Sequence, residues 1–177
     1  MSWDKDIEEL RRREALAEQM GGEERVARQK ASGKLTARER VTALLDPGSL
    51  HETGKIAGRA TYGADNEMTD FLPTPFVVGR GAIDGRPVSV QSDDFSVRGG
   101  AADAGIWQKL VFAEQMANEY RMPIVRMVDG TGGGGSVKML EKDPRTYIPQ
   151  TPGWEWVVAN MASVPVVALA LGPCAGL

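Results

Sequence analysis

From residue 76 onward, apolar positions recur first with the period of strands and then with the period of helices. Runs at 76–78, 82–83 and 87–91 flank Asp84-Gly85, a dipeptide that favours a two-residue hairpin turn. A helical stretch follows and is predicted to end before Pro123. Its one apolar face is predicted to consist of Ile106, Leu110, Ala113, Ala117 and Tyr120.

Two later apolar runs, at 123–128 and 164–171, are rich in β-branched residues and predict buried strands. A shorter helix is predicted between them, around Trp154, Val157, Val158 and Met161. The order strand, helix, strand, helix, strand predicts an α/β fold with a mostly parallel, layered sheet. Ligands of such sheets bind beyond the carboxyl ends of the strands. Both glycine-rich turns of the chain, at 129–136 and 172–177, fall there.

The first part of the chain has a different pattern. Residues 4–30 are highly charged. Their apolar residues form a narrow stripe at helical spacing, Ile7, Leu10, Ala17 and Met20, and Gly21-Gly22 is predicted to end this helix. A narrow apolar stripe is typical of a helix that lies on another surface. Thr36 and Glu39 form a capping box that begins a second helix, which ends near Asp46-Pro-Gly48. We predict a helical N-terminal arm over 1–48 and one subdomain over 49–177, in which 49–75 is irregular and polar.

Composition narrows the class of protein. With 42% hydrophobic and 25% charged residues, the chain is typical of a soluble globular protein. A formal net charge of −3 argues against nucleic-acid binding as the main activity. The N-terminus lacks the apolar segment of a signal peptide, and no apolar run approaches the roughly 20 residues that span a bilayer, so we expect a cytoplasmic protein without a membrane partner. One cysteine permits neither an internal disulfide nor a Cys₄ zinc site, and no metal is predicted.

The glycine turns are the strongest chemical signal. Glycine after a buried strand lets backbone N–H groups face a ligand, and two such turns side by side can aim two amides at one carbonyl oxygen, as in an oxyanion hole. A dinucleotide site is the alternative, since Gly130–Gly135 satisfies G-x-G-x-x-G and Glu155 follows about 20 residues later. We favour it less, because the next helix would have to end by Asp143-Pro144. We interpret the single histidine, His51, as a structural or surface residue and Cys174 as a packing residue.

Four segments carry a family resemblance. They are Gly33-Lys-Leu-Thr-Ala-Arg-Glu-Arg-Val41 with Leu44-Leu-Asp-Pro-Gly48, Gln91-Ser-Asp-Asp-Phe-Ser-Val-Arg-Gly-Gly100, Pro123 to Ser136, and Gly172-Pro-Cys-Ala-Gly176. In this order they resemble the carboxyltransferase (β) subunits of biotin-dependent acyl-CoA carboxylases, of the propionyl-, methylcrotonyl- and acetyl-CoA carboxylase type. The resemblance covers about residues 22–177 and corresponds to the N-terminal portion of those subunits.

The resemblance implies a crotonase-like (ClpP/crotonase) superfold, incomplete at its C-terminal end, whose N-terminal half binds acyl-CoA. The implied reaction transfers CO₂ from carboxybiotin to the α-carbon of an acyl-CoA. The backbone amides of Gly176 and Leu177 would then bind the thioester oxygen of the enolate. For acyl-CoA binding we expect contacts from Gly99, Gly100, Ala101, Gly132, Gly133, Gly134, Lys34 and Arg38.

The family also implies partners. We expect carboxybiotin to arrive on a biotin carboxyl carrier, supplied by a biotin carboxylase, and the complete protein to form a homo-oligomer, a hexamer. Two alternatives stay open: the α subunit of a biotin-dependent acyl-CoA decarboxylase, and a non-catalytic CoA-binding or assembly module. By this family's pattern the biotin-binding C-terminal half lies outside the sequence, and the fragment alone is expected to be inactive.

Overall fold

The computed structural model describes residues 2–101, 106–131, 141 and 153–174. The chain begins with three helices, α1 (Asp4–Glu18), α2 (Glu23–Ala31) and α3 (Ala37–Leu44). The predicted break at Gly21-Gly22 separates α1 from α2, and the predicted capping box begins α3, with the Thr36 side chain accepting a hydrogen bond from the Glu39 amide. Both predictions for this part of the chain are therefore confirmed.

The main sheet of the described chain has five strands in the order β1-β4-β5-β6-β7. Its strands are β1 (His51–Glu52), β4 (Phe76–Ile83), β5 (Arg86–Asp93), β6 (Ile124–Gly130) and β7 (Val166–Cys174). Strands β5, β6 and β7 are parallel, whereas β1, β4 and β5 pair antiparallel. The α/β class is confirmed, but the sheet is mixed rather than mostly parallel, because the β4–β5 hairpin reverses the chain direction at one side.

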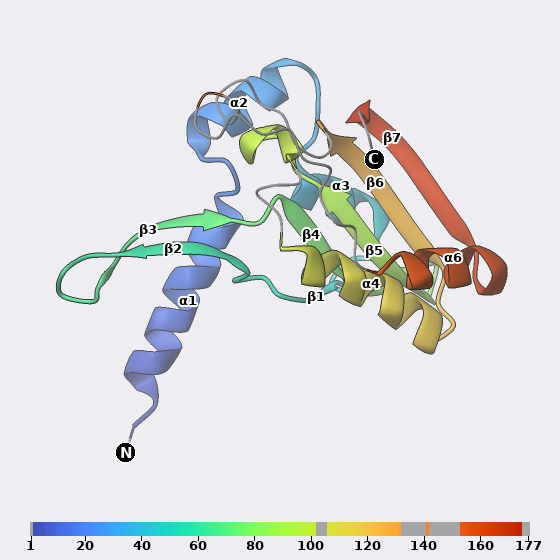
Figure 1. Ribbon diagram of the computed structural model, residues 1–177, viewed down its shortest axis with the longest axis horizontal. Helices are drawn as coiled ribbons and strands as arrows, with labels where there is room; N and C mark the ends of the chain where they lie inside the picture. Colours follow the sequence, from blue (N-terminus) through green and yellow to red (C-terminus); the bar gives the residue numbers. More distant parts are fainter. Residues whose placement is uncertain (1, 102–105, 132–140, 142–152, 175–177) are drawn as a thin grey trace.

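Helices cover both faces of this sheet. Alternation along β4 directs Val77 into the main core with α3, while Phe76 and Val78 pack in a second cluster with Ala113 of α4 (Trp107–Glu119). Helix α6 (Trp154–Ser163) packs beside α4, as Figure 1 shows. The main core consists of Met20, Ala37, Val41, Leu45, Val77, Val88, Val90, Val97, Val125 and Met127. Helix α3, which the predicted arm includes, thus belongs to the same core as the sheet.

The β4–β5 turn has the geometry that its sequence predicts. Asp84 and Gly85 have φ angles of 50° and 74°, and two positive φ angles at the central positions are typical of a type I′ hairpin turn. The Asp46 carboxylate accepts hydrogen bonds from both amides, at 3.0 and 2.8 Å. This hairpin therefore depends on local sequence together with hydrogen bonds to the segment after α3.

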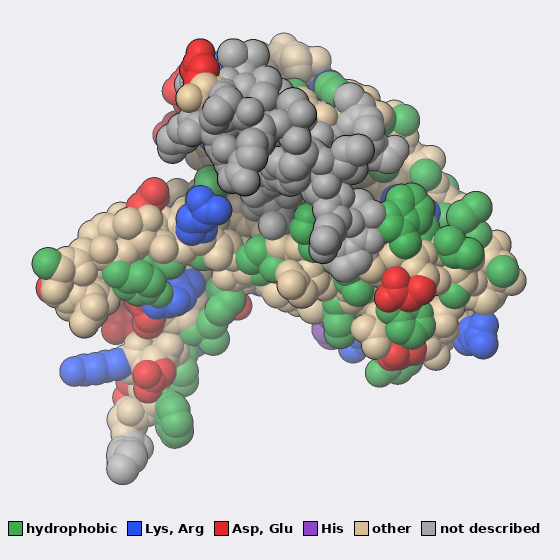
Figure 2. All heavy atoms as spheres, viewed as in Figure 1, with side chains coloured by type: hydrophobic (Ala, Val, Ile, Leu, Met, Phe, Trp, Pro, Cys, Tyr) green, Lys and Arg blue, Asp and Glu red, His purple; other side chains and the backbone are tan. Residues whose placement is uncertain are grey.

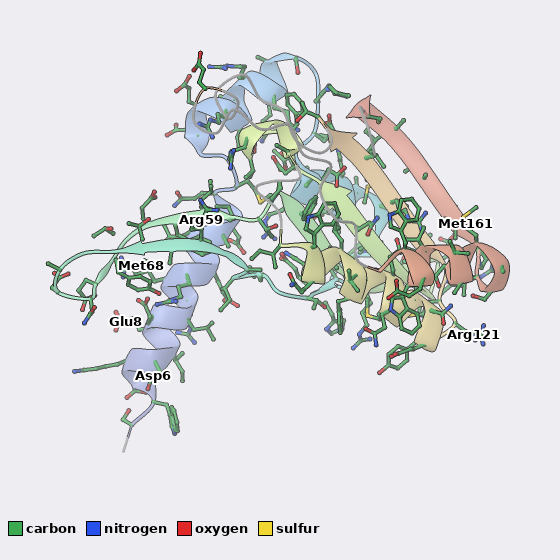
Figure 3. All side chains as sticks on the ribbon, in the orientation of Figure 1. Asp6, Glu8, Arg59, Met68, Arg121 and Met161 are labelled. Atoms are coloured by element: carbon green, nitrogen blue, oxygen red, sulfur yellow. The ribbon has the colours of Figure 1, made fainter. Side chains whose placement is uncertain are left out.

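The prediction of an irregular segment at 49–75 is wrong. It contains β1 and a separate antiparallel pair, β2 (Gly58–Tyr62) and β3 (Met68–Pro73). Together with α1, this pair extends away from the main sheet (Figure 1). The Arg12 guanidinium donates to the Met68 carbonyl at 2.8 Å, which holds α1 against β3, and Figure 3 shows Met68 beside this helix. Of these two strands only Met68 and Pro73 are buried, and β3 shows no alternation of apolar and polar residues, so the pattern did not reveal the pair.

Several apolar residues of the predicted helices are exposed. Tyr120, on the predicted apolar face of α4, is 73% exposed, because it lies just beyond the last helical turn. On α6, the side chains of Trp154, Val158 and Met161 are also exposed, because only one side of this helix packs against α4. Met161 projects outward in Figure 3, and apolar side chains gather over this part of the surface in Figure 2. Cys174 is exposed as well, so the prediction that it packs inside is wrong.

Candidate functional site at the carboxyl ends of the parallel strands

Three glycine-containing segments meet at one edge of the sheet. Because β5, β6 and β7 are parallel, their carboxyl ends lie together, with Gly99 and Gly100 after β5, Gly130 in β6 and Gly172 in β7. The Thr131 amide donates to the Gly99 carbonyl at 3.1 Å, which joins the segment after β6 to that after β5. Gly130 pairs with Cys174 across β6 and β7, after a register shift between Val128 and Gly130. The expected position of the two turns at one edge is confirmed for their described parts.

The first of these segments needs glycine for both conformation and space. Gly99 and Gly100 lie in the short 3₁₀ helix η1 (Arg98–Gly100) with φ angles of 69° and 65°. A Cβ on Gly100 would lie 2.7 Å from the Asp129 carbonyl oxygen, closer than real side chains approach. The backbone of η1 therefore rests directly on the end of β6, and Ala101 follows it in an extended conformation.

A buried carboxylate with two cations lies beneath these turns. Asp129, at the end of β6, is completely buried, and its Oδ2 atom accepts from Arg40 Nη2 of α3 at 2.5 Å. Lys34 Nζ lies 3.6 Å from Oδ1 of the same carboxylate and 5.5 Å from the centre of the Phe95 ring. Arg40 is itself only 6% exposed, while Lys34 keeps 32% of its side chain exposed. This group connects α3 and the segment before it to the strand ends.

A second carboxylate, Asp93 at the end of β5, adjoins this group. Its Oδ2 atom accepts a hydrogen bond from the Asp129 amide at 3.1 Å. Burial raises the pKa of Asp93 to about 6; the Asp129 amide opposes this rise, the Asp129 charge adds to it and the Arg40 charge opposes it. Neighbouring Asp94 has a structural task, since it accepts from the amides of Ala37 and Ser96 at 3.1 and 2.7 Å.

The Asp93→Asn variant is expected to be more stable than the wild type at pH 7, by up to about 3 kcal/mol. In the folded chain Asp93 holds its proton up to a pKa of about 6, against 3.8 without burial, so folding stability decreases as pH rises between these values. Asparagine keeps an acceptor for the Asp129 amide and carries no charge, so its stability should change less over this window. Urea unfolding at pH 4, 5, 6 and 7 measures the difference.

Asp84→Asn is the matched control for this experiment, because it removes a carboxylate from the exposed hairpin turn, at a positive φ that asparagine tolerates. An Asp93→Asn variant whose pH dependence equals that of the wild type and of Asp84→Asn would contradict the raised pKa.

Of the two predicted basic binding residues, only Lys34 lies at the strand ends. Arg38 forms two hydrogen bonds to the Glu52 carboxylate, at 2.6 and 3.2 Å, on the edge strand β1. Lys109 of α4 reaches the same carboxylate at 3.5 Å, so Glu52 connects helices on both faces of the sheet. Burial lowers the pKa of Lys109 to about 8, while the Glu52 charge opposes this shift and the Arg38 charge adds to it.

The remaining predicted site residues fall in three groups. Gly99, Gly100 and Ala101 lie at the strand ends as expected. The predicted oxyanion amides of Gly176 and Leu177 lie outside the described residues, and so do Gly132, Gly133 and Gly134. His51 is exposed on β1. The glycines that the dinucleotide alternative requires after Thr131 are likewise outside the described part of the chain.

Sequence reasoning missed the charged residues that support the site: Asp129, Arg40, Asp93, Glu52 and Lys109. Asp129 ends a predicted strand immediately before a glycine run, and a carboxylate at that point was a usable signal. Its partner Arg40 lies 89 positions earlier, and no sequence pattern joins two residues at that separation.

The described residues contain neither a candidate membrane span nor a candidate metal centre. None of their helices is both long and apolar enough to cross a bilayer. The same residues contain no group of three or more histidine, cysteine, aspartate or glutamate side chains that could hold a metal ion.

Comparison with known proteins places this geometry in context. The family model described as "Carboxyl transferase domain" matches residues 28–177. The mitochondrial propionyl-CoA carboxylase beta chain of Rattus norvegicus is 33% identical over 158 residues, which are 88% of this chain and 28% of that protein. The methylmalonyl-CoA carboxyltransferase 12S subunit of Propionibacterium freudenreichii subsp. shermanii is 36% identical over 177 residues, 96% of this chain and 32% of the relative.

Solved structures agree with the sequence matches. The crystal structure of the transcarboxylase 12S hexamer with methylmalonyl-coenzyme A and methylmalonic acid bound has a TM-score of 0.64 at 29% identity, over 91% of this chain and 29% of that one. A single-chain, multi-domain long-chain acyl-CoA carboxylase has a TM-score of 0.70 at 24% identity, over 96% of this chain and 18% of that one, and supports the fold alone. The chain thus has the crotonase-like fold of these carboxyltransferases and spans about a third of the length of its curated relatives.

Proposed function

Because the chain belongs to the carboxyl transferase domain family, we propose that it is part of the carboxyltransferase component of an acyl-CoA carboxylase. In this role it transfers CO₂ from carboxybiotin to the α-carbon of an acyl-CoA. The family match over residues 28–177 carries the proposal. The meeting of three glycine segments at the carboxyl ends of β5, β6 and β7 supports it, because that edge is where ligands of such sheets bind.

The chemistry assigned to this chain is stabilisation of negative charge. Removal of the α-proton of a thioester places charge on the thioester oxygen, and fixed backbone amides stabilise it without reorganising. We assign this role to the amides of Gly176 and Leu177, which follow β7. Carboxybiotin supplies the CO₂ and the base when its carrier delivers it. The described strand ends offer main-chain groups, and we assign only the acyl-CoA side of the reaction to these residues.

The complete enzyme is proposed to be a cytoplasmic homo-oligomer that works with a biotin carboxylase and a biotin carboxyl carrier. The transcarboxylase 12S relative, whose crystal structure describes a hexamer assembly, supports a hexamer here as well.

The experiment that tests the proposed function measures CO₂ transfer. The intact gene product is mixed with carboxylated biotin carrier protein and propionyl-CoA, and methylmalonyl-CoA formation is followed by chromatography. Acetyl-CoA and longer acyl-CoAs, offered in parallel, define the preferred acyl chain. Formation of a carboxylated thioester supports the proposal, and absence of transfer with every acyl-CoA, for a folded protein, overturns it.

Lys34→Ala is expected to weaken propionyl-CoA binding about tenfold, which corresponds to about 1.4 kcal/mol. We propose that Lys34 contacts the phosphates of CoA, because its side chain is partly exposed and its ammonium lies at the strand ends near Phe95. Arg38→Ala is expected to act in the same direction and more weakly, because Glu52 already holds the Arg38 guanidinium. Isothermal titration calorimetry measures both dissociation constants.

The control for charge is Lys5→Ala, which removes one cation from an exposed position on the projecting helix α1. Equal affinities for Lys34→Ala and Lys5→Ala would refute the phosphate contact of Lys34, and an Arg38→Ala variant that binds as tightly as the wild type would do so for Arg38.

A further inference from the structure

Asp129 is the residue on which the glycine segments converge. Its carbonyl oxygen lies against Gly100, its amide donates to Asp93 at the end of β5, and its side chain lies against Gly172 in β7. Arg40 and Lys34 form ion pairs with its carboxylate. One residue therefore contacts all three strand ends and the N-terminal segment at once.

The contact with Gly172 depends on space rather than on backbone conformation. Gly172 is not among the glycines with positive φ, so its backbone would accept another residue. A Cβ at this position would nevertheless overlap Asp129 Oδ1 and lie 2.6 Å from Lys34 Nζ. The carboxylate and its lysine thus occupy the place that a side chain at 172 would fill, and the backbone of β7 rests directly on them.

The charges make this support rigid. Asp129 is fully buried and Arg40 nearly so, and separating the pair is costly because each charge would be left buried without its partner. The end of β6 and the end of β7 also share the shifted register at Gly130 and Cys174. Asp129 thus lies against Gly172 between two paired positions of these strands, Val128 with Ala170 and Gly130 with Cys174.

We propose that Asp129 is a positioning residue for the end of β7: its carboxylate, held by Arg40 and Lys34, sets the position of Gly172 and Cys174. This inference rests on the proposed function, since it assigns Asp129 to the support of the oxyanion amides. Asp129 touches no reacting atom in this scheme, and its effect passes through the backbone.

The test compares Asp129→Asn with Glu114→Gln. Both substitutions remove the charge of a buried carboxylate that pairs with arginine, but Glu114 pairs with Arg126 between α4 and β6, away from the strand ends. Asp129→Asn is expected to shift the amide NMR signals of Gly172 and Cys174, which Glu114→Gln leaves in place. In the intact gene product, we expect Asp129→Asn to lower kcat up to about 10²-fold. The KM for propionyl-CoA should change less than kcat in that variant, and Glu114→Gln should retain kcat.

Gly172→Ala is the second variant, because it keeps every charge and only inserts a methyl group against the Asp129 carboxylate. It is expected to lower kcat in the same way as Asp129→Asn, and it decides the question if that variant does not fold. Unchanged kcat in whichever of these two variants folds, or unchanged Gly172 and Cys174 signals in Asp129→Asn, would overturn the positioning role. A wild type that transfers no CO₂ while those signals still move would instead reject the proposed function and leave the structural support intact.

Discussion

Replacing Leu177 with proline is expected to lower kcat by about 10²–10³-fold, the usual effect of losing one oxyanion-hole donor. Proline lacks the backbone N–H that we assign to the thioester oxygen, and it removes that donor without removing a charge. The Kd for propionyl-CoA is expected to change far less, since the charge on the oxygen develops only as the α-proton leaves. Steady-state kinetics of the intact gene product, with calorimetry for binding, separates the two effects.

The matched control for this prediction is Leu177→Ala, which shortens the side chain and retains the amide donor. It is expected to keep kcat within a few fold of the wild type, because the assigned interaction is made by the main chain. Wild-type turnover in a folded Leu177→Pro enzyme would show that this amide does not bind the oxyanion. A loss of kcat in Leu177→Ala as large as that in Leu177→Pro would indicate that the side chain matters instead.

Replacing Arg40 with methionine is expected to lower the free energy of unfolding by about 3–5 kcal/mol, as removal of one partner from a buried ion pair does. Methionine fills much of the same volume, so the main loss is the charge. Asp129 would then remain fully buried with Lys34 at 3.6 Å and with the carboxylate of Asp93 nearby. Urea unfolding of the chain at pH 7 measures the change.

An exposed ion pair gives the comparison that this prediction needs. Arg28 on α2 pairs with Glu24 at 2.7 Å, but their side chains are 76% and 84% exposed. Arg28→Met is expected to change stability by no more than about 0.5 kcal/mol. If the two arginine variants unfold at the same urea concentration, the Arg40–Asp129 pair contributes nothing beyond a surface pair.

The elements that the sequence predicts well are those set by neighbouring residues. Helix α3 begins where Thr36 and Glu39 can cap it, and the β4–β5 hairpin turns where Asp84-Gly85 accepts two positive φ angles. Both the start of α3 and the hairpin turn depend on residues within a few positions of one another. The apolar run of β6 was equally readable, because a strand buried in a sheet needs apolar side chains along its length. The run of β7 does form a strand, but the prediction that it is buried is wrong, because it is the outermost strand of the described sheet and most of its residues are exposed.

Contacts between distant segments account for what the sequence did not reveal. In the β2–β3 pair, β3 shows no alternation of apolar and polar residues, and a hydrogen bond from Arg12 of α1 to the Met68 carbonyl holds this strand. Asp93 and Asp94 are neighbours in the chain, yet one receives the Asp129 amide and the other caps the start of α3. Identical residue types at adjacent positions thus acquire different tasks only when the fold brings different partners to them.

The candidate site also combines residues that the sequence located correctly with one that it did not. Family resemblance and the glycine pattern located the strand ends, and the structure places Gly99, Gly100 and Lys34 there. Arg38 looked equivalent to Lys34 from the sequence, because both are basic residues of one segment. Only the folded chain shows that the Glu52 carboxylate holds Arg38 at β1, the outer strand on the side of the sheet opposite β7.

Strand β7 is the outermost strand of the described sheet, and its two faces are both largely exposed. Val167, Leu169 and Leu171 are 47%, 36% and 38% exposed there. An edge strand of this kind presents a row of backbone donors and acceptors beside apolar side chains. A segment of another chain can pair with this row and add a further strand to the sheet. In concentrated solution the chain therefore carries its own template for association, and its colloidal behaviour depends on whether something occupies that edge.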